Sequence, residues 1–211
     1  MQKRTQKWTV GIIVAIISFT LIGSSFVSIF QPGMEQDEQN QSQQILEKEY
    51  NERKQIVEAL TAKLEGNPED SDTKLALGDA YYDKAIVTAQ LNVKEHKEDL
   101  GKAKEMYRQV LAKEESSDVM LKLATTAFLL GDSELAEKTY NKILQKEPEN
   151  SGALYGYGMF LFYEKDDHQQ AQELWQKALG LTTDEYLQQR LEEMITLAKG
   201  MELNPNEAED K

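Results

Sequence analysis

The sequence predicts an all-α protein, in which one transmembrane helix near the amino terminus is followed by a solenoid of helical hairpins. Three observations lead to this prediction. Thr9 to Phe30 is a stretch of 22 residues without a charge. Beyond it, apolar residues recur at helical spacings of three and four. Three alanines, Ala103, Ala136 and Ala171, are also each followed four positions later by an aromatic residue, and they recur at offsets of 33 and 35 residues.

We expect Thr9 to Phe30 to cross a membrane as a single helix. At about 1.5 Å of rise per residue such a helix covers roughly 33 Å, and the hydrocarbon core of a bilayer is about 30 Å thick. Residues 1–8 carry three basic side chains and no acid, whereas acids follow the stretch. The positive-inside rule therefore predicts a basic cytoplasmic amino terminus at 1–8, an anchor in the cell membrane, and an extracytoplasmic remainder.

A cleaved signal peptide is the alternative to an anchor, because it has the same order of charged and apolar parts around a shorter core. Val10 to Ile22 is close to that shorter length, and the Gly-Ser-Ser triplet at 23–25 resembles a weak cleavage site. Phe26 to Phe30 carries the apolar character further, which favours an anchor that stays attached.

The composition argues against several classes of function. The chain has 37 acidic residues against 24 lysines and arginines, for a net charge of −13. Phosphate binding needs clustered positive charge, so we expect no nucleic-acid partner. The chain has no cysteine, which removes disulfides, thiolate chemistry and cysteine metal sites together. We expect no metal and no cofactor.

Turn residues divide the remaining chain into segments with helical spacing. Gln31-Pro32-Gly33 ends the apolar stretch, since proline lacks an N–H and glycine is flexible. From Ile45 the apolar residues fall on one helical face, until a Gly-Asn-Pro sequence at 66–68 ends the helix. The expected organisation is a polar stalk at 31–44, a helix forming a degenerate half-repeat at 45–66, three repeat units within 67–182 (67–115, 116–149 and 150–182), a closing helix at 183–200 and an acidic disordered tail at 201–211.

Internal repetition is the most informative feature of the sequence. Ala103, Ala136 and Ala171 are each followed four positions later by tyrosine or tryptophan. Small residues let two helices approach closely, and large aromatic residues fill the space where helix pairs stack. The helices expected ahead of these alanines carry Leu77-Gly78-x₂-Tyr81, Leu123-Ala124-x₂-Ala127 and Tyr157-Gly158-x₂-Leu161.

This pattern resembles the tetratricopeptide repeat (TPR), a 34-residue pair of antiparallel helices with small and aromatic residues at these spacings. The resemblance covers roughly residues 56–200 and implies a binding scaffold that is not an enzyme. Ala127 stands where the family has an aromatic residue. Gly131-Asp132-Ser133 fits the tight turn between the two helices of a unit. Single-span TPR proteins of this layout are similar to accessory factors of secretion and of cytochrome c maturation.

The first repeat unit is longer than the family pattern. Leu77 is 26 residues ahead of Ala103, whereas the matching distances in the other units are 13 and 14 residues. We expect the extra residues to lengthen the first helix and to leave Lys94 to Glu98 in the loop. Thr183 is expected to cap the closing helix, with acids in its first turn.

The resemblance also implies a concave groove that holds an extended or helical peptide along the first helix of each unit. A lysine, arginine and asparagine set that grips a terminal carboxylate in one TPR subclass is missing here. Acids and aromatic residues suit an amphipathic or partly basic protein segment better. The expected groove residues are Asp79, Tyr82, Asp83, Lys122, Thr125, Phe128, Tyr155, Met159, Phe162 and Tyr163.

No residue pattern points to catalysis. His96 and His168 are expected in solvated loops, and Glu69 to Asp72 is expected to cap a helix, since it lacks the spacing of a calcium loop. We therefore expect a protein-binding adaptor. Three alternatives stay open: a self-associating structural protein, a cytosol-facing organelle receptor with a signal anchor, and an enzyme with an unrecognised carboxylate site.

Overall fold

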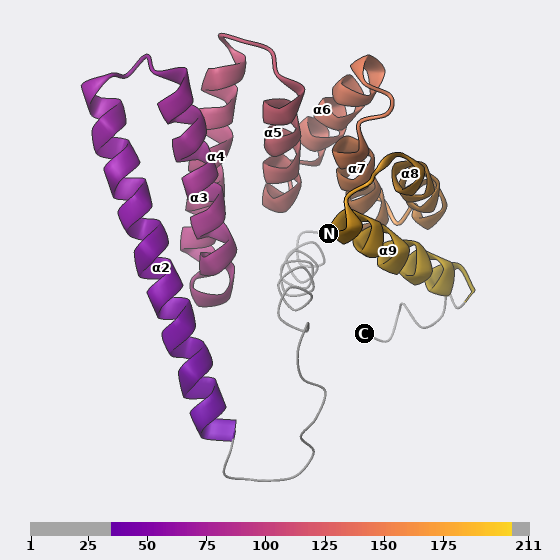
Figure 1. Ribbon diagram of the computed structural model, residues 1–211, viewed down its shortest axis with the longest axis horizontal. Coiled ribbons are helices and arrows are strands. Elements are labelled where there is room, and N and C mark those ends of the chain that lie inside the picture. The colour runs from indigo at the N-terminus through magenta and orange to yellow at the C-terminus, as the bar shows by residue number, and fades with distance from the viewer. Residues whose placement is uncertain (1–34, 204–211) are drawn as a thin grey trace. The chain divides into compact units, whose positions relative to one another are not determined.

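The computed structural model describes residues 35–203, and all its regular structure in this range is helical (Figure 1). The expected all-α class is confirmed over these residues. None of the helices described between residues 35 and 203 is long and apolar enough to cross a membrane. The expected anchor at 9–30, the basic segment at 1–8 and residues 204–211 of the expected tail lie outside the described range.

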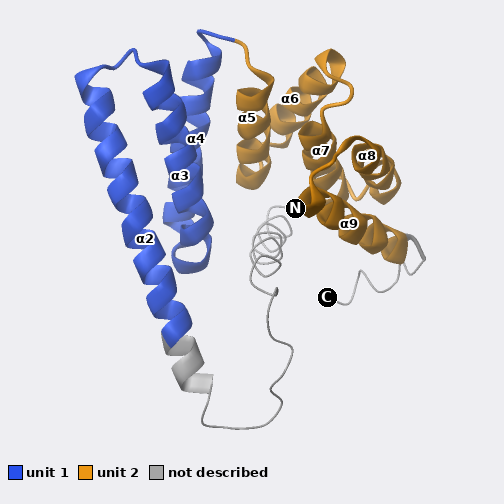
Figure 2. Ribbon diagram, viewed as in Figure 1, with its two compact units in different colours: residues 1–114 blue, residues 115–211 orange. Residues whose placement is uncertain are grey.

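The chain divides into two compact units, residues 1–114 and residues 115–211 (Figure 2). Unit 1 contains α2 (Glu35–Gly66), α3 (Ser71–Leu91) and α4 (Val93–Leu111). Helix α3 packs most extensively against α4, and α2 packs against α3. Unit 1 is therefore a long helical hairpin with one additional helix along its side.

Unit 2 consists of two short hairpins and a last helix. The hairpins pair α5 (Ser117–Leu130) with α6 (Ser133–Lys146) and α7 (Ser151–Glu164) with α8 (His168–Leu181). Helix α9 (Glu185–Leu203) packs on α8, as expected of a closing helix. Helix α7 also contacts both helices of the preceding hairpin, which is the arrangement of stacked repeats.

In both units, a glycine on the first helix of a hairpin packs against an aromatic ring on the second helix. A methyl group on Gly78 would lie 2.8 Å from Cε1 of Tyr107, which is 1% exposed. A methyl group on Gly158 would meet three ring atoms of Trp175 within 2.8 Å, and Trp175 is fully buried. The expected close approach of two paired helices at small residues is therefore confirmed at Gly78 and Gly158, but these two rings fill space within a hairpin rather than between neighbouring pairs.

The turn residues end and begin helices as the sequence predicts. Gly131 ends α5 in the left-handed conformation, with φ of 75°, which a residue without a Cβ adopts readily. The side chain of Asp132 then accepts a hydrogen bond from the Leu135 N–H at the start of α6. The Asp70 carboxylate accepts from the N–H groups of Asp72 and Thr73, which confirms the expected helix cap ahead of α3.

Two helix boundaries in unit 1 differ from expectation. The stalk expected at 31–44 is helical from Glu35, because residues 35–44 contain neither glycine nor proline to interrupt a helix. Lys94 to Glu98 is not a loop but the start of α4, since the Asn92 side chain accepts from the N–H groups of Lys94 and Glu95. The extra residues of the first unit therefore lengthen both helices of its hairpin.

The closing helix and the histidines also differ from expectation. Asp184 rather than Thr183 caps α9, accepting from the Leu187 N–H at 2.9 Å, and the helix runs on to Leu203. His96 is 2% exposed on α4, because its Nδ1 hydrogen bonds to the Ala85 carbonyl oxygen of α3 at 2.7 Å. His168 is half-buried at the start of α8, with its ring 4.6 Å from the Phe162 ring.

Candidate partner-binding surfaces

The residues expected to bind a partner fall in both units, three on α3 and seven on α5 and α7. In unit 2, the most accessible aromatic members are Tyr155 and Tyr163, both half-buried on α7. Burial raises the pKa of the Tyr155 hydroxyl, and Arg190 of α9 beside it acts in the opposite direction. Burial also raises the pKa of Tyr163, which lies close to Tyr155 and Arg190.

Helix α9 adds two residues to this surface that the sequence analysis did not name. Tyr186 is 68% exposed and lies close enough to influence the Tyr155 hydroxyl electrostatically. The Arg190 guanidinium is paired with Glu193 at 2.9 Å. A tyrosine four positions before an arginine on the closing helix was a visible signal, because such residues share a helical face. We call Tyr155, Tyr163, Tyr186 and Arg190 the tyrosine–arginine surface.

The α5 part of the expected site is polar and lies around one buried hydroxyl group. The Thr125 hydroxyl and the Tyr140 hydroxyl are 3.2 Å apart. A methyl group on Gly156 would lie 3.0 Å from the same Tyr140 oxygen, so the glycine makes room for the ring. Lys122 is half-buried one turn before Thr125. This part of the surface offers hydroxyl and ammonium groups rather than apolar area.

Three of the expected groove residues belong to the core of unit 2. Phe128, Met159 and Phe162 are between 4% and 8% exposed. The Phe128 ring contacts Phe160 edge to face at 5.8 Å, and the Phe162 ring is 5.6 Å from Trp175. These side chains stabilise the hairpins, because buried aromatic contacts of this kind contribute to packing. They offer little surface to a partner.

The expected members in unit 1 already take part in contacts within the unit. The Tyr107 hydroxyl donates to Asp79 Oδ1 at 2.8 Å. Asp83 is exposed and lies 3.5 Å from the Arg53 guanidinium of α2. Tyr82 is half-buried, and burial together with the charge of Asp83 raises its pKa to about 12. The α3 surface is therefore acidic, in contrast to the tyrosine–arginine surface.

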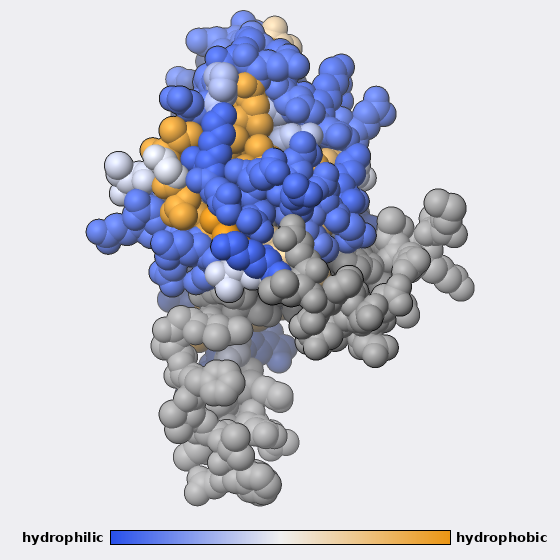
Figure 3. Space-filling model, turned by 90° about the vertical axis from the view of Figure 1, so that its right-hand side faces the viewer, coloured by the Kyte–Doolittle hydropathy of each residue, from blue (hydrophilic) through white to orange (hydrophobic). Residues whose placement is uncertain are grey.

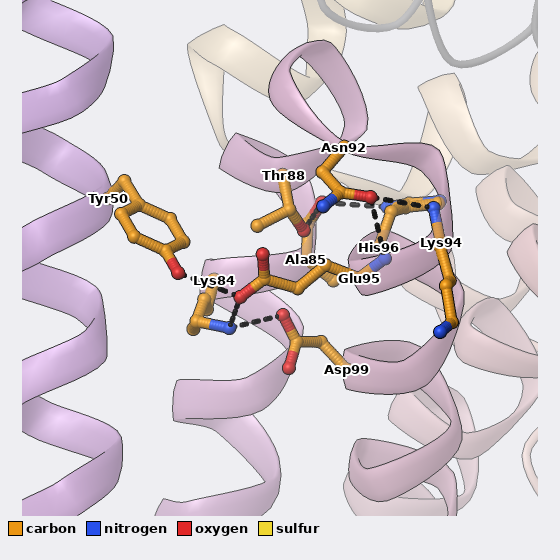
Figure 4. A network of polar contacts seen from close by, with 9 residues as sticks. All are labelled: Tyr50, Lys84, Ala85, Thr88, Asn92, Lys94, Glu95, His96 and Asp99. Carbon is orange, nitrogen blue, oxygen red and sulfur yellow. Dashed lines mark hydrogen bonds and ion pairs between the residues drawn. The ribbon is translucent and has the colours of Figure 1, made fainter.

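A buried ionic cluster in unit 1 was also missed (Figure 4). The Lys84 ammonium lies 2.6 Å from Glu95 Oε1 and 2.7 Å from Asp99 Oδ2. The Tyr50 hydroxyl of α2 donates to the same Glu95 oxygen at 2.9 Å. The side chains of Lys84 and Asp99 are only 8% and 2% exposed. We call Tyr50, Lys84, Glu95 and Asp99 the ionic cluster.

The two carboxylates of the ionic cluster respond differently to their surroundings. The hydrogen bond from Lys84 lowers the pKa of Glu95, although burial opposes this. Burial raises the pKa of Asp99 more than the neighbouring ammonium lowers it. For Lys84, burial opposes protonation, but the hydrogen bonds to Asp99 and Glu95 together raise its pKa. Across residues 35–203, no group of three or more acidic or histidine side chains is arranged to hold a metal ion.

On the face drawn in Figure 3, hydrophilic residues predominate and hydrophobic ones form smaller areas between them. A partner that contacts this face would therefore meet small apolar areas between hydrophilic side chains.

The comparisons with known proteins add little to this description. No protein-family model matches the chain, and no curated protein is similar to it. Among solved structures, it is similar to the crystal structure of YrrB, described as a TPR protein with an unusual peptide-binding site. The identity is 18% and the TM-score 0.35, over 65% of this chain and 99% of that chain.

This likeness is too low to carry an argument about function. The architecture is instead established by the helix pairs themselves, by their stacking in unit 2, and by the glycine–aromatic contacts at Gly78 and Gly158. Residues 35–203 form an all-α fold of paired helices, and the pairs of unit 2 stack as repeats.

Proposed function

We propose that the protein is a scaffold that binds protein or peptide partners, anchored in the cell membrane with its helical units outside the cytoplasm. A TPR-like fold is suited to protein–protein interaction, because its helix pairs present long exposed surfaces on a rigid frame. The observation that carries the proposal is the tyrosine–arginine surface. Tyrosine and arginine are the residue types most often found at the energetic centres of protein interfaces.

The chemistry of the chain favours a particular kind of partner. Tyrosine rings offer apolar area and a hydroxyl group, so they suit an amphipathic segment. The excess of 37 acidic over 24 basic residues would attract basic groups at the edges of that segment. A partly basic, amphipathic peptide or protein segment is therefore the expected ligand.

Site-specific photo-crosslinking in living cells tests the binding surface. A photoreactive amino acid at Tyr163 or Tyr186 of the full-length protein should form a discrete adduct with another protein. Lys177, exposed on α8, provides the control position. Adducts at Lys177 alone would overturn the proposed surface, and an adduct only with a second copy would favour the self-associating structural protein instead.

The membrane arrangement is part of the same proposal. It is based on the uncharged stretch at 9–30 and on the three basic residues that precede it. Protease added outside intact cells, after removal of any outer barrier, should degrade the helical units. Full protection of residues 35–203 would contradict the extracytoplasmic location and favour a cytosol-facing receptor.

The process in which the scaffold acts follows from the partner. We propose secretion or cytochrome c-type assembly, on the similarity of layout to accessory factors of both. Identification of the crosslinked protein by mass spectrometry separates the two, since the partners would be a secreted chain and a cytochrome assembly component respectively.

A further inference from the structure

The two parts of α2 are attached to unit 1 by different kinds of contact. From Val57 onward, apolar side chains hold the helix: Val57, Leu60 and Leu64 pack with Leu77 and Ala80 of α3. Between residues 41 and 56, in contrast, no side chain is buried. Almost no buried apolar contact therefore attaches the earlier part of α2 to the hairpin.

Polar contacts connect this earlier part to the rest of unit 1. The Tyr50 hydroxyl donates to Glu95 at 2.9 Å, and its ring lies 5.3 Å from the Lys84 ammonium. Arg53 pairs with Asp83 at 3.5 Å, but both side chains are about half exposed, at 43% and 52%. Exposed pairs of this kind contribute little to stability. Tyr50 is therefore the main point of attachment.

The receiving site for Tyr50 is built by the extra length of the hairpin. Helices α3 and α4 have 21 and 19 residues, whereas the four hairpin helices of unit 2 have 14 each. Lys84, Glu95 and Asp99 all lie in the part of the hairpin next to the α3–α4 turn. His96 in the same part is also buried, and its Nε2 has no hydrogen-bond partner among residues 35–203.

A hydrogen-bonded attachment behaves differently from an apolar one. When Tyr50 moves away, water can replace its hydroxyl at Glu95, and the carboxylate remains bound to Lys84. The exchange leaves no buried group unpaired, so its free-energy cost is limited to the net contribution of one hydrogen bond to a charged acceptor. Detaching Val57 and Leu64 would instead expose apolar surface to water, which is unfavourable. Local opening is expected where buried apolar contacts are few.

We infer that the first part of α2, Glu35 to Arg53, is a strap that opens and closes on the α3–α4 hairpin. The hydrogen bond from Tyr50 to Glu95, which is itself paired with Lys84, holds the strap closed. The apolar segment 57–64 stays packed on α3 when the strap opens. Opening uncovers the side of α3 and α4 that carries the ionic cluster. This device goes beyond partner binding and does not depend on the tyrosine–arginine surface.

Hydrogen exchange of backbone amides in the full-length chain tests the strap. Tyr50→Phe removes only the hydroxyl that donates to Glu95 and leaves the ring in place, so the variant is expected to fold. Amides at 42–53 should exchange about tenfold faster or more than in the parent chain, since one hydrogen bond to a charged acceptor is lost. Amides at 57–64 should exchange at the parent rate. Tyr186→Phe, which removes an exposed hydroxyl in unit 2, is the matched control and should change neither segment.

Three outcomes would overturn the inference. Equal exchange rates at 42–53 in the parent chain and in Tyr50→Phe would show that the Tyr50 hydroxyl does not hold the strap closed. Equal acceleration at 42–53 and 57–64 would show that α2 detaches as a whole. Unprotected amides at 42–53 in the parent chain would show that the strap does not close.

Discussion

The two units use the same helix pairing but build their interiors from different chemistry. In unit 2, rings fill the space between 14-residue helices, and Tyr140, Phe160 and Trp175 are fully buried. In unit 1, the hairpin is longer, and its added part buries a lysine between two carboxylates. In the longer hairpin, the buried charged groups therefore satisfy one another.

The difference shows what each interior is suited for. Apolar packing stabilises a fixed arrangement, because buried rings lose contacts on any displacement. A buried ion pair contributes less net stability than apolar residues of the same volume, but removing one partner is strongly unfavourable. Unit 1 therefore has an apolar end and a polar end, and at the polar end the Tyr50–Glu95 contact can be exchanged for water. The predictions below test this contrast between the units.

The largest effect is expected from Lys84→Met. The substitution leaves Glu95 and Asp99 without their ammonium group, and Asp99 is 1% exposed. An unpaired buried charge costs about 3–5 kcal/mol. Chemical denaturation, with segment-resolved hydrogen exchange to separate the units, should show this loss in unit 1 and none in unit 2.

Two further variants sharpen the Lys84 prediction. Lys84→Met combined with Asp99→Leu should recover part of the loss, because an apolar pair replaces the ionic one. Lys113→Met removes an ion pair with Glu69 whose side chains are 40% and 79% exposed, and it should change stability little. A similar loss from Lys84→Met and Lys113→Met would contradict the distinction.

The next largest effect is expected from Gly158→Ala in unit 2. The added methyl group would overlap the Trp175 ring and break the bond from its Nε1–H to the Tyr155 carbonyl oxygen, now 3.1 Å. Overpacking of this kind costs about 1–3 kcal/mol. Gly78→Ala in unit 1 should cost less, because only one Tyr107 atom would be as close as 2.8 Å.

Gly180→Ala serves as the control for both glycine substitutions. A methyl group there would meet no atom within 4 Å, so helix propensity alone should stabilise the chain, by up to about 1 kcal/mol. Urea denaturation measures all three variants. If Gly158→Ala were as stable as Gly180→Ala, the glycine–aromatic contact would not hold the hairpin together.

Alkaline pH should weaken unit 1 through Tyr82. Its pKa is raised from 10.0 to about 12 in the folded protein, mainly by burial. A raised pKa gives a contribution to stability that is fully present below the unfolded value and is lost as pH rises through the folded value. The free energy of unfolding should therefore fall between about pH 10 and about pH 12.

Tyr82→Phe separates the contribution of Tyr82 to this pH dependence from that of Lys84. Lys84 also titrates at alkaline pH, in the parent chain and in the variant alike. The variant should show a shallower fall in stability over the same range. Parallel pH profiles for the parent chain and Tyr82→Phe would mean that Tyr82 ionises equally easily in the folded and unfolded chain.

The sequence was sufficient to predict the helix pairs, since their signals are local. Ala103 with Tyr107 and Gly131 with Asp132 each occupy one helix or one turn, and the structure confirms the roles of both sets. The placement of the extra residues was not predictable in the same way. Asn92 ends one helix and caps the next, and only the packing of both helices makes this short turn favourable.

The ionic cluster and part of the binding surface were missed for physical reasons. Lys84 falls at the core-facing spacing after Leu77 and Ala80, which was a usable signal, but its partners lie on α4 after the turn. Charged residues are rarely buried unless paired, and the pairing depends on tertiary contacts. Phe162 was expected in the groove because the register alone does not reveal that Trp175 covers it.

The smallest effects are expected from removing helix caps, and they should also differ between the units. Asp70 accepts hydrogen bonds from Asp72 N–H, Thr73 N–H and the Thr73 hydroxyl, at 3.1, 3.2 and 2.6 Å. The hydrogen bond that Asp132 accepts from the Leu135 N–H is longer, at 3.4 Å. The first backbone N–H groups of a helix lack partners within it, so a side-chain acceptor stabilises them. Asp70→Ala should therefore lower the urea midpoint more than Asp132→Ala. The reverse order would mean that unit 1 depends on its caps less than unit 2 does, and that its stability comes mainly from the hairpin interior.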